Sequence, residues 1–412
     1  MANENVATNR STQRFELARL SVVFGSLERG IGTALALLRV PLLIWALSLY
    51  QYGLYMAILG VVATAHLLDF GLHYGVVNAV AEARGRDDLS AVGRIIATAF
   101  VIYSLIASAV ALLILPAFAL LPMGWLLNVP PDQETLARNV ALLGYAGVVL
   151  PLPLKVFSAG MQGFQKQYVI SAFRSAWHIV IFGVLAAAVA LFPENLIIVV
   201  AVGTAGELLY WLAVALVAVR RQPELTLRFK KASRSLAPSL TAVGLAFFVT
   251  NIANLFKFTL GNTVVSHGLG PGAVPSLAVP LALYMAAHGI ASMGNESLWP
   301  AYGEAATRGE WEWVQRAFCL GAKVALGLSG AFAVLGGLLG GALIEVWTPK
   351  EISVSEPMLL LLSAWLLSQM CFNVAASLLA ALKRVSVMMY FSLFEGIGVF
   401  GLSLWWVEPL GA

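Results

Sequence analysis

Apolar segments long enough to cross a membrane recur along almost the whole sequence. Each reaches the roughly 18 residues that a helix needs to span a hydrocarbon core of about 30 Å. Only 11% of the 412 residues are charged, whereas a soluble protein carries about a quarter. The sequence therefore predicts an all-α polytopic membrane protein with about 11–12 transmembrane helices. The eleven segments are 20–48, 53–80, 95–118, 137–158, 169–192, 196–219, 237–262, 278–300, 317–343, 356–381 and 386–407.

Basic residues between these segments predict the orientation of the chain. With the N-terminus inside, the cytoplasmic segments hold seventeen Lys and Arg residues, and the outer segments hold only Arg138 and Lys350. Lys and Arg favour the cytoplasmic side of a membrane. We therefore expect residues 1–19 to be a cytoplasmic tail, and the basic stretch 220–236 to anchor the topology. A nucleic-acid partner is not expected.

The two halves of the sequence resemble each other weakly. "AEARGRDDLSAVGR" (81–94) follows the second segment, and "GEAATRGEWEWVQR" (303–316) follows the eighth. "GMQGFQKQYVISAF" (160–173) corresponds in the same way to "LLAALKRVSVMMYF" (378–391). In both pairs the second stretch begins about 220 residues after the first. A constant spacing of this kind is typical of transporters built from internal repeats. The pattern predicts two pseudo-symmetric bundles with the substrate path between them, near the membrane midplane.

The repeat also predicts how the chain is divided. We expect a six-helix bundle over 20–219, a basic linker over 220–236 and a second bundle over 237–412 in which five helices are clear. A twelfth helix is expected after Glu408 and is absent from the sequence. Either the protein works with eleven helices, or the sequence is shorter than its full reading frame.

One stretch carries a resemblance to a known group of proteins. "QYGLYMAILGVVATAHLLDFGLHYGVVNAVAEARGRDD" (51–88) contains Tyr-Gly-Leu at 52–54 and Leu-Asp-Phe-Gly-Leu at 68–72, followed by a loop of mixed charge. Together with "MQGFQKQY" (161–168), it resembles the polysaccharide-biosynthesis branch of the MOP flippase superfamily, the Wzx-type O-antigen and oligosaccharide flippases. Members typically have twelve or more helices in a MATE-like arrangement of two bundles.

The resemblance implies a function that composition does not show. It implies movement of an undecaprenyl-diphosphate-linked oligosaccharide from the cytoplasmic to the periplasmic leaflet by alternating access. The oligosaccharide would be a repeat unit of O-antigen (lipopolysaccharide), capsule or exopolysaccharide. The resemblance further implies a bacterial inner-membrane location, with a polysaccharide polymerase and a chain-length regulator as partners.

Charged residues within the apolar segments are the candidate site residues. A charge at a helix centre costs about 2.5–3.5 kcal/mol on insertion scales, so most of them should face a hydrated cavity, a partner or the headgroups. The bases are Arg29, Arg39, Lys155, Arg174, Lys257 and Lys323, and the acids are Glu28, Asp69, Glu207, Glu296 and Glu395.

A cavity between the bundles should be basic, because a diphosphate head needs cations in lipid and a guanidinium can bind it with two hydrogen bonds. Glu28 and Arg39 are three helical turns apart and share one face of the first helix, about 16 Å apart. Lys257 lies on the seventh helix, which the repeat makes equivalent to the first. We expect the substrate cavity to be lined by Arg39, Lys155, Arg174, Lys257, Asn251 and Asn254.

The intramembrane acids have a second candidate use. We assign gating or ion coupling to Glu28, Asp69, Glu207 and Glu296, with H⁺ or Na⁺ as the coupled ion, although each acid would serve equally as a structural counter-ion. No cofactor is expected.

Asp69 forms a helical stripe with His66 and His73, just before Gly71 and Gly75 permit a bend. A metal site is one interpretation of this stripe, but no further ligand supports it. We favour a role for Asp69 as a counter-ion or hydrogen-bond acceptor that holds the cytoplasmic end of the first bundle.

Two other functions remain open. A MATE-type exporter of drugs or small cations would be expected to have an acidic cavity. The apolar segments of this sequence contain six bases and five acids, which points mildly the other way. A membrane enzyme, such as a polysaccharide polymerase or ligase, usually carries its chemistry on long loops, and the longest outer connection is only 119–136. The sequence has no phosphate-binding loop, zinc spacing or nucleophile elbow, and Cys319 and Cys371 lie in apolar segments. We therefore expect a transporter without enzymatic activity.

Overall fold

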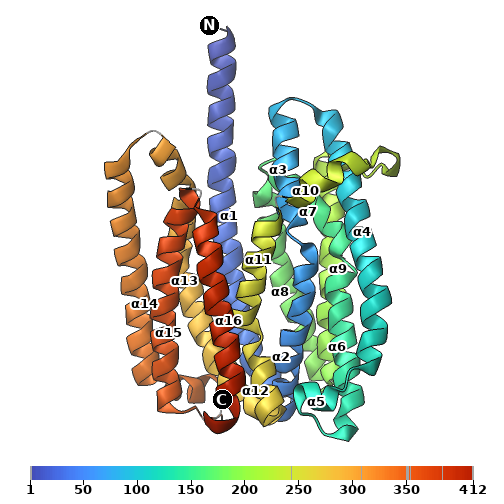
Figure 1. The fold of residues 1–412 in the computed structure, drawn as a ribbon, viewed down its shortest axis with the longest axis vertical. Coiled ribbons are helices and arrows are strands. Elements are labelled where there is room, and N and C mark those ends of the chain that lie inside the picture. Colours follow the sequence, from blue (N-terminus) through green and yellow to red (C-terminus); the bar gives the residue numbers. More distant parts are fainter. Residues whose placement is uncertain are drawn as a thin grey trace.

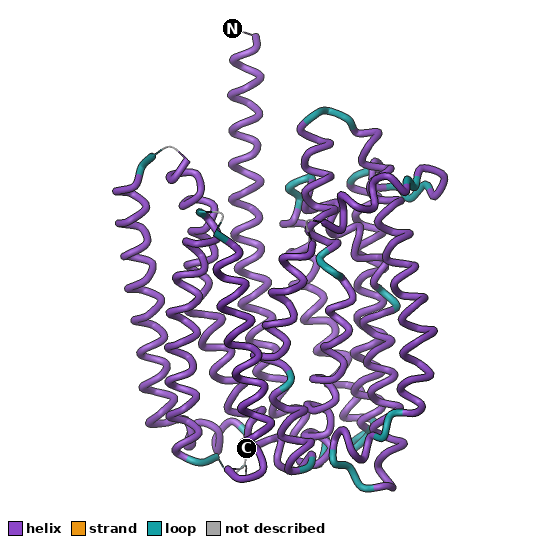
Figure 2. Tube along the Cα trace, in the orientation of Figure 1, coloured by secondary structure: helices purple, strands orange, loops and turns teal. Residues whose placement is uncertain are grey.

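The protein is an elongated bundle of membrane-length helices (Figure 1). The computed structural model describes residues 2–242, 244–307, 309–348, 352, 354–382 and 384–410. These residues form sixteen α-helices joined by short turns and contain no β-strand (Figure 2). Ten helical segments among them are long and apolar enough to cross a membrane. The expected all-α membrane fold is confirmed.

The helices fall into two sets that follow the sequence. The first set is α1 (Ala2–Ala46), α2 (Leu49–Ala63), α3 (Leu72–Gly85), α4 (Leu89–Leu120), α5 (Met123–Leu127), α6 (Glu134–Val149), α7 (Lys155–Gly163), α8 (Gln167–Leu191) and α9 (Leu196–Arg221). The second set is α10 (Ala237–Ala242), α11 (Gly244–Asn254), α12 (Gly261–Leu269), α13 (Val274–Thr307), α14 (Trp311–Trp347), α15 (Glu356–Ala381) and α16 (Val385–Leu410).

Equivalent helices pack in equivalent ways in the two sets. In the first bundle α1 packs along α8, and in the second α11 and α12 pack along α16. Likewise, α3 contacts α4 and α7, whereas α13 contacts α14 and α15. The structure therefore has the two pseudo-symmetric bundles that the repeat predicts.

The predicted seventh helix, 237–262, is not one regular helix. It consists of α10, α11, a π-helical turn at Leu255–Thr259, and α12, which continues to Leu269. A π-helical turn inserts an extra residue into the helix and is frequent at functional sites. Here it carries Lys257.

The second predicted helix is broken at Asp69. A 3₁₀ segment, Thr64–Asp69, separates α2 from α3, and Phe70 and Gly71 follow with φ of 46° and 70°. A left-handed conformation is costly for a residue with a side chain. The ring of Phe70 packs against Phe248, with centroids 5.1 Å apart, which helps to hold it there. The bend expected near Gly71 is confirmed.

The basic connections lie together at one end of the molecule. Figure 1 shows the turns α3–α4, α7–α8, α9–α10 and α13–α14 at the end nearer the N-terminus, whereas α5 and α12 lie at the opposite end. Residues 2–19, expected as a polar tail, continue α1 as a helix that projects beyond the bundle. A cytoplasmic location of this end remains a prediction.

The two bundles meet along two equivalent pairs of helices. The helix α1 contacts α13, and α2 contacts α12. At Gly53 of α2 the contact is so close that an added Cβ would lie 1.8 Å from the carbonyl oxygen of Pro271. Nearby, Thr263 donates a hydrogen bond to the Ala57 carbonyl at 2.9 Å, and Ser266 donates one to the Leu127 carbonyl at 2.7 Å. The bundles are therefore joined tightly at the end opposite the N-terminus.

Candidate functional site

A polar cavity lies between the two bundles, in the part nearer the N-terminal end. Its volume is about 340 Å³, and α1 and α8 of the first bundle and α13 of the second line it. Side chains of both bundles face this space. The lining residues are Glu28, Arg29, Gly32, Thr33, Arg174, His178, Gly289, Ser292 and Met293.

Arg174 rests on an aromatic platform at the edge of this cavity. Its guanidinium carbon lies 4.3 Å from the ring centroid of Tyr210 and 5.9 Å from that of Trp211. Both rings are on α9, and Tyr210 stacks with Phe173 of α8, centroids 5.7 Å apart. A cation over an aromatic face is stabilised by the ring quadrupole, by about 0.5–2 kcal/mol. The platform therefore fixes the orientation of Arg174.

The counter-ion of Arg174 is held by a different partner. The Arg174 Nη2 and Glu207 Oε1 atoms are 3.8 Å apart, which is too long for a hydrogen bond. Instead Glu207 Oε2 accepts a hydrogen bond from Trp211 Nε1 at 3.1 Å. The Arg174 guanidinium thus has a nearby negative charge without being locked onto it.

Lys155 extends the same charged region toward α7. Its ammonium group lies 5.8 Å from the Trp211 ring centroid and interacts electrostatically with Asp69, Glu207 and Arg174. Asp69 in turn accepts a hydrogen bond from the Tyr103 hydroxyl on α4. The first bundle therefore joins three predicted cavity or gating residues, Asp69, Lys155 and Glu207, in one electrostatic network.

Glu28 and Arg39 belong to this region as well. Both interact electrostatically with His178, a lining residue of the cavity, which agrees with their predicted place on one face of α1. The Nε atom of Arg39 is buried and has no hydrogen-bond partner among the described residues. An unsatisfied buried donor is costly, by about 1–3 kcal/mol. The described residues that line the cavity do not include Arg39, so its role in substrate binding stays a prediction.

The two predicted asparagines line a second, smaller cavity. Asn251 and Asn254 border a space of about 270 Å³ together with His66 and Thr259. His66 interacts electrostatically with Lys155. The second bundle thus presents two amides close to the charged region of the first.

Lys257 has a separate environment. Its side chain is only 3% exposed, and its Nζ lies 2.6 Å from Glu395 Oε2 of α16. Gln369 of α15 donates a hydrogen bond to the other oxygen of Glu395, and the Phe372 ring lies 4.7 Å from the ammonium. Lys257 thus forms its ion pair within the second bundle, whereas Arg39 interacts electrostatically with His178 of the first bundle. A direct role of Lys257 in substrate binding stays a prediction.

The members of the His66, Asp69 and His73 stripe have different surroundings. Asp69 pairs with Tyr103, His73 bonds Gln162 Oε1 at 2.9 Å, and His66 lines the smaller cavity. The part of the chain that the structure describes holds no group of three His, Cys, Asp or Glu side chains that could bind a metal ion. A gating role of Asp69 stays a prediction.

Two candidate residues remain. The side chain of one is exposed, and that of the other is not described. Lys323 is exposed on α14. The side chain of Glu296 lies outside the described residues, so its predicted role in gating or coupling is not tested.

The aromatic platform is what the sequence reasoning missed. Glu207, Tyr210 and Trp211 are spaced i, i+3 and i+4 and share one face of α9. That spacing was the available signal, because an aromatic pair beside an intramembrane acid is well suited to hold a cation. Which cation it holds depends on the packing of α8 against α9, which the local sequence does not specify.

Comparison with known proteins identifies one family and several solved structures. A family model described as polysaccharide biosynthesis protein matches residues 21–306. No curated protein matches the chain. The lipid II flippase MurJ in an inward closed conformation is 12% identical with a TM-score of 0.68, over 95% of this chain and 82% of that chain.

Two transporters of the same fold are similar. The MATE transporter VcmN of Vibrio cholerae is 15% identical with a TM-score of 0.63, over 97% of each chain. A MOP superfamily transporter from Pyrococcus furiosus is 16% identical with a TM-score of 0.58, over 95% of this chain and 88% of that chain. At these identities the likeness establishes the fold.

Proposed function

Because this chain belongs to the polysaccharide biosynthesis protein family, we propose that it is a flippase for an undecaprenyl-diphosphate-linked oligosaccharide. The lipid would pass from the cytoplasmic to the periplasmic leaflet of the bacterial inner membrane by alternating access. The observation that carries the proposal is the position of Arg174, which faces the cavity between the bundles and is oriented by aromatic rings.

The charged region suits a diphosphate. A bound phosphate would compete with Glu207 for Arg174, since Arg174 Nη2 and Glu207 Oε1 are 3.8 Å apart and make no direct hydrogen bond. Charge-assisted hydrogen bonds of a guanidinium to a phosphate are stronger than neutral ones. Arg39 and Lys155 add two more positive charges to the region, since Arg39 interacts electrostatically with His178 and Lys155 with Arg174 and Glu207. We assign these three bases to the phosphates.

The other lining groups suit the sugars and the conformational change. Hydroxyl and amide groups of Thr33, Ser292, Asn251 and Asn254 offer hydrogen bonds to a glycan from both bundles. Release of Glu207 when phosphate takes Arg174 would leave an acid free to bind H⁺ or Na⁺. Coupling of transport to H⁺ or Na⁺ would use Glu28, Asp69, Glu207 or Glu296. A polysaccharide polymerase and a chain-length regulator would then use the delivered lipid.

A MATE-type exporter of organic cations is the second candidate. Glu207 is about half exposed and lies beside Tyr210 and Trp211, an arrangement that also suits an aromatic or quaternary cation. The fold is shared with the Vibrio cholerae transporter. The two candidates differ in the charge of the transported molecule.

Translocation in proteoliposomes distinguishes them. Purified protein is reconstituted, and inner-leaflet polyprenyl-diphosphate saccharide is followed as it becomes accessible to an outside glycosidase. We expect translocation by the wild type, and a loss of about tenfold or more for Arg174→Gln, since a charge-assisted hydrogen bond contributes about 1.5–3 kcal/mol. Lys323→Gln removes an exposed cation on α14 and serves as the matched control. Export of ethidium without lipid movement would overturn the proposal in favour of the exporter.

A further inference from the structure

The linker between the two bundles lies against the flank of α4. It contains three 3₁₀ turns, Pro223–Leu225, Phe229–Lys231 and Arg234–Leu236. All three turns contact α4, and Figure 1 shows the linker, in yellow-green, projecting sideways past α4 at the end nearer the N-terminus. A loop that only connects two helices through water would lie beyond their ends. The position on the side of the bundle therefore points to a second role.

Three residues fix the linker in this position. Leu225 is fully buried. The Ser233 N–H donates a hydrogen bond to Thr98 Oγ1 of α4 at 2.9 Å. The Phe229 ring meets the Phe100 ring of α4 edge to face, with centroids 5.7 Å apart. The linker is thus an ordered part of the first bundle.

These contacts place the linker at the edge of the hydrocarbon core. Arg94 is the last charged residue of α4, and residues 95–120 carry no charge. Phe100 lies six residues after Arg94, which is about 9 Å along the helix. Phe229 packs on Phe100 and is still 61% exposed, so its ring faces lipid. Interfacial elements bury apolar side chains about 5–10 Å into the boundary between headgroups and acyl chains, and Phe229 lies at this depth.

The exposed face of the linker is basic. Residues 220–236 hold six Lys and Arg residues and a single acid, Glu224. One carboxylate oxygen of Glu224 is buried, whereas Arg228, Lys230 and Arg234 are exposed. These three cations have no ion-pair partner among the residues that the structure describes. Long basic side chains can reach the headgroups while their stems lie along apolar surface.

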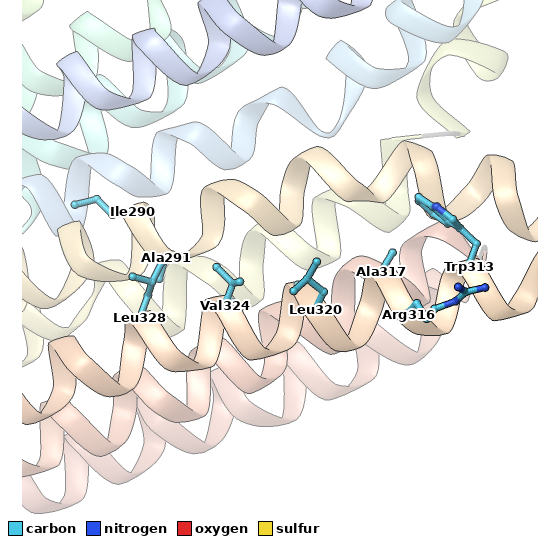
Figure 3. Close-up of a pocket in the computed structure, with 10 residues that line it drawn as sticks. Ile290, Ala291, Trp313, Arg316, Ala317, Leu320, Val324 and Leu328 are labelled. Atoms are coloured by element: carbon cyan, nitrogen blue, oxygen red, sulfur yellow. The ribbon is translucent and has the colours of Figure 1, made fainter.

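The second bundle presents a similar aromatic and basic pair, but with a compensated charge. Trp313 and Arg316 lie together on α14, at one end of an apolar groove (Figure 3). Arg316 is 78% exposed, and its Nη2 atom lies 3.3 Å from Glu312 Oε2. The linker therefore differs from this pair in the charge it leaves without a counter-ion.

We propose that the linker binds the headgroups of anionic phospholipids, with Arg228, Lys230 and Arg234 on the phosphates and the Phe229 ring among the acyl chains. An acidic soluble protein or a nucleic acid would not reach a ring on the flank of a membrane helix, whereas lipid surrounds it. The site is separate from the cavity of Arg174 and does not depend on the flippase function. Because the linker packs on α4, bound lipid would hold the first bundle at a fixed depth in the membrane.

Hydrogen exchange of the whole chain in nanodiscs tests the proposal. The nanodiscs contain phosphatidylcholine with a rising fraction of phosphatidylglycerol, and exchange in the linker peptides is followed by mass spectrometry. We expect protection of residues 226–236 to rise with phosphatidylglycerol and to saturate, and added salt to weaken it by screening. Inorganic phosphate added to pure phosphatidylcholine nanodiscs should have no effect. Protection that ignores phosphatidylglycerol, or that free phosphate reproduces, would overturn the proposal.

A matched pair of arginines sharpens the test. Arg228→Gln should raise the phosphatidylglycerol fraction at half-protection about fivefold, the share of one basic residue near an anionic surface. Arg316→Gln removes an exposed arginine that is already paired with Glu312, and should leave that fraction unchanged. Lys230→Gln should act like Arg228→Gln, which guards against a local distortion at one position. Equal shifts in the Arg228 and Arg316 variants would show a general surface attraction and overturn the site.

The aromatic ring gives a second readout. Phe229→Ser removes the apolar contact with lipid and should lower protection with and without phosphatidylglycerol. Phe229→Leu keeps an apolar side chain and should retain most of the protection. Equal protection in the two variants would overturn the placement of this side chain among the acyl chains.

The substrate cavity separates this inference from the proposed function. Arg174→Gln should impair translocation and leave the lipid response of the linker unchanged. A response that disappears in Arg174→Gln would mean that phosphatidylglycerol acts through the cavity, and would overturn the linker site even in a working flippase. A response that persists in a protein that moves no lipid-linked sugar would support the linker site and overturn only the flippase function.

Discussion

Lys257 and Glu395 form a buried ion pair with 2.6 Å between Nζ and Oε2. The lysine lies in the π-helical turn of the seventh span, and the glutamate on α16 also accepts a hydrogen bond from Gln369 of α15. Three segments of the second bundle thus converge on one carboxylate. Because each charge compensates the other, the pair is tolerated in a low-dielectric interior.

Removal of one partner should destabilise the second bundle. We expect Lys257→Met or Glu395→Leu to lower the free energy of unfolding by about 3–5 kcal/mol, because each leaves an uncompensated buried charge. The double variant should recover most of this loss. Unfolding in detergent by increasing SDS measures all three proteins. Single variants as stable as the wild type would show that the pair is not a structural link.

Asp69 should matter more for movement than for binding. It ends the 3₁₀ segment at the helix break and is fixed by the Tyr103 hydroxyl. We expect Asp69→Asn to slow translocation at least tenfold with little change in equilibrium binding of a polyprenyl-diphosphate saccharide. Tyr103→Phe, which removes only the donor, should show a smaller defect of the same kind. Loss of binding with an unchanged transport rate for bound lipid would contradict the gating role.

The contact of Gly53 with Pro271 should tolerate no side chain. An added Cβ would lie 1.8 Å from a backbone oxygen, so Gly53→Ala has to push α2 away from the second bundle. We expect a loss of about 1–3 kcal/mol, the usual cost of overpacking, seen as a lower Tm. Gly272→Ala is the control, since a Cβ there meets no atom within 4 Å. An equal Tm for the two variants would argue against a tight contact.

Asp88 should make the start of α4 sensitive to acid. Its carboxylate accepts hydrogen bonds from the Ser90 hydroxyl at 2.6 Å and the Ala91 N–H at 3.0 Å, and these hold the pKa of Asp88 below its ordinary value. A lowered folded-state pKa means that the stabilisation is present above the ordinary Asp pKa of about 3.9 and is lost as the pH falls through the folded value.

Hydrogen exchange at the first turn of α4 measures this effect. Protection of the Ala91 amide should fall as the pH drops below about 4 in the wild type. Asp88→Asn should keep the cap, because Asn is as good an N-cap as Asp, but without the pH dependence. Asp88→Ala should show reduced protection at every pH, because the Ala91 amide then keeps only its bond to the backbone carbonyl of residue 88. A pH-independent wild type would refute the assignment.

Hydropathy predicted most of the fold because the spans respond to a local requirement. Each apolar segment has to satisfy its own backbone hydrogen bonds in lipid, so composition alone shows where a helix lies.

The family resemblance, drawn from 51–88 and 161–168, is confirmed by the match over residues 21–306. The irregularities were harder: the bend near Gly71 has a glycine signal, whereas the π-helical turn at Leu255–Thr259 has none in the local sequence.

The candidate site was predictable only in part. Charges in lipid must find partners, so the list of intramembrane acids and bases already held Arg174, Glu207, Lys257 and Glu395. Which of them meet depends on how helices far apart in sequence are rotated against each other. The sequence placed Lys257 in one cavity with Arg39, which stays a prediction. It did not show that the packing of the π-helical turn on α16 brings Lys257 to Glu395.

The two halves are units of sequence, but they are not independent units of packing. The helix α2 belongs to the first half, yet much of its surface packs on α12, α13 and the Pro271–Ala273 turn of the second half. If the chain were cut in the linker 220–236 and the pieces made separately, the first piece would present that face of α2, which includes Gly53 and Gly60, uncovered in the membrane. Split halves should therefore reassemble on each other, and neither should persist as a stable protein on its own.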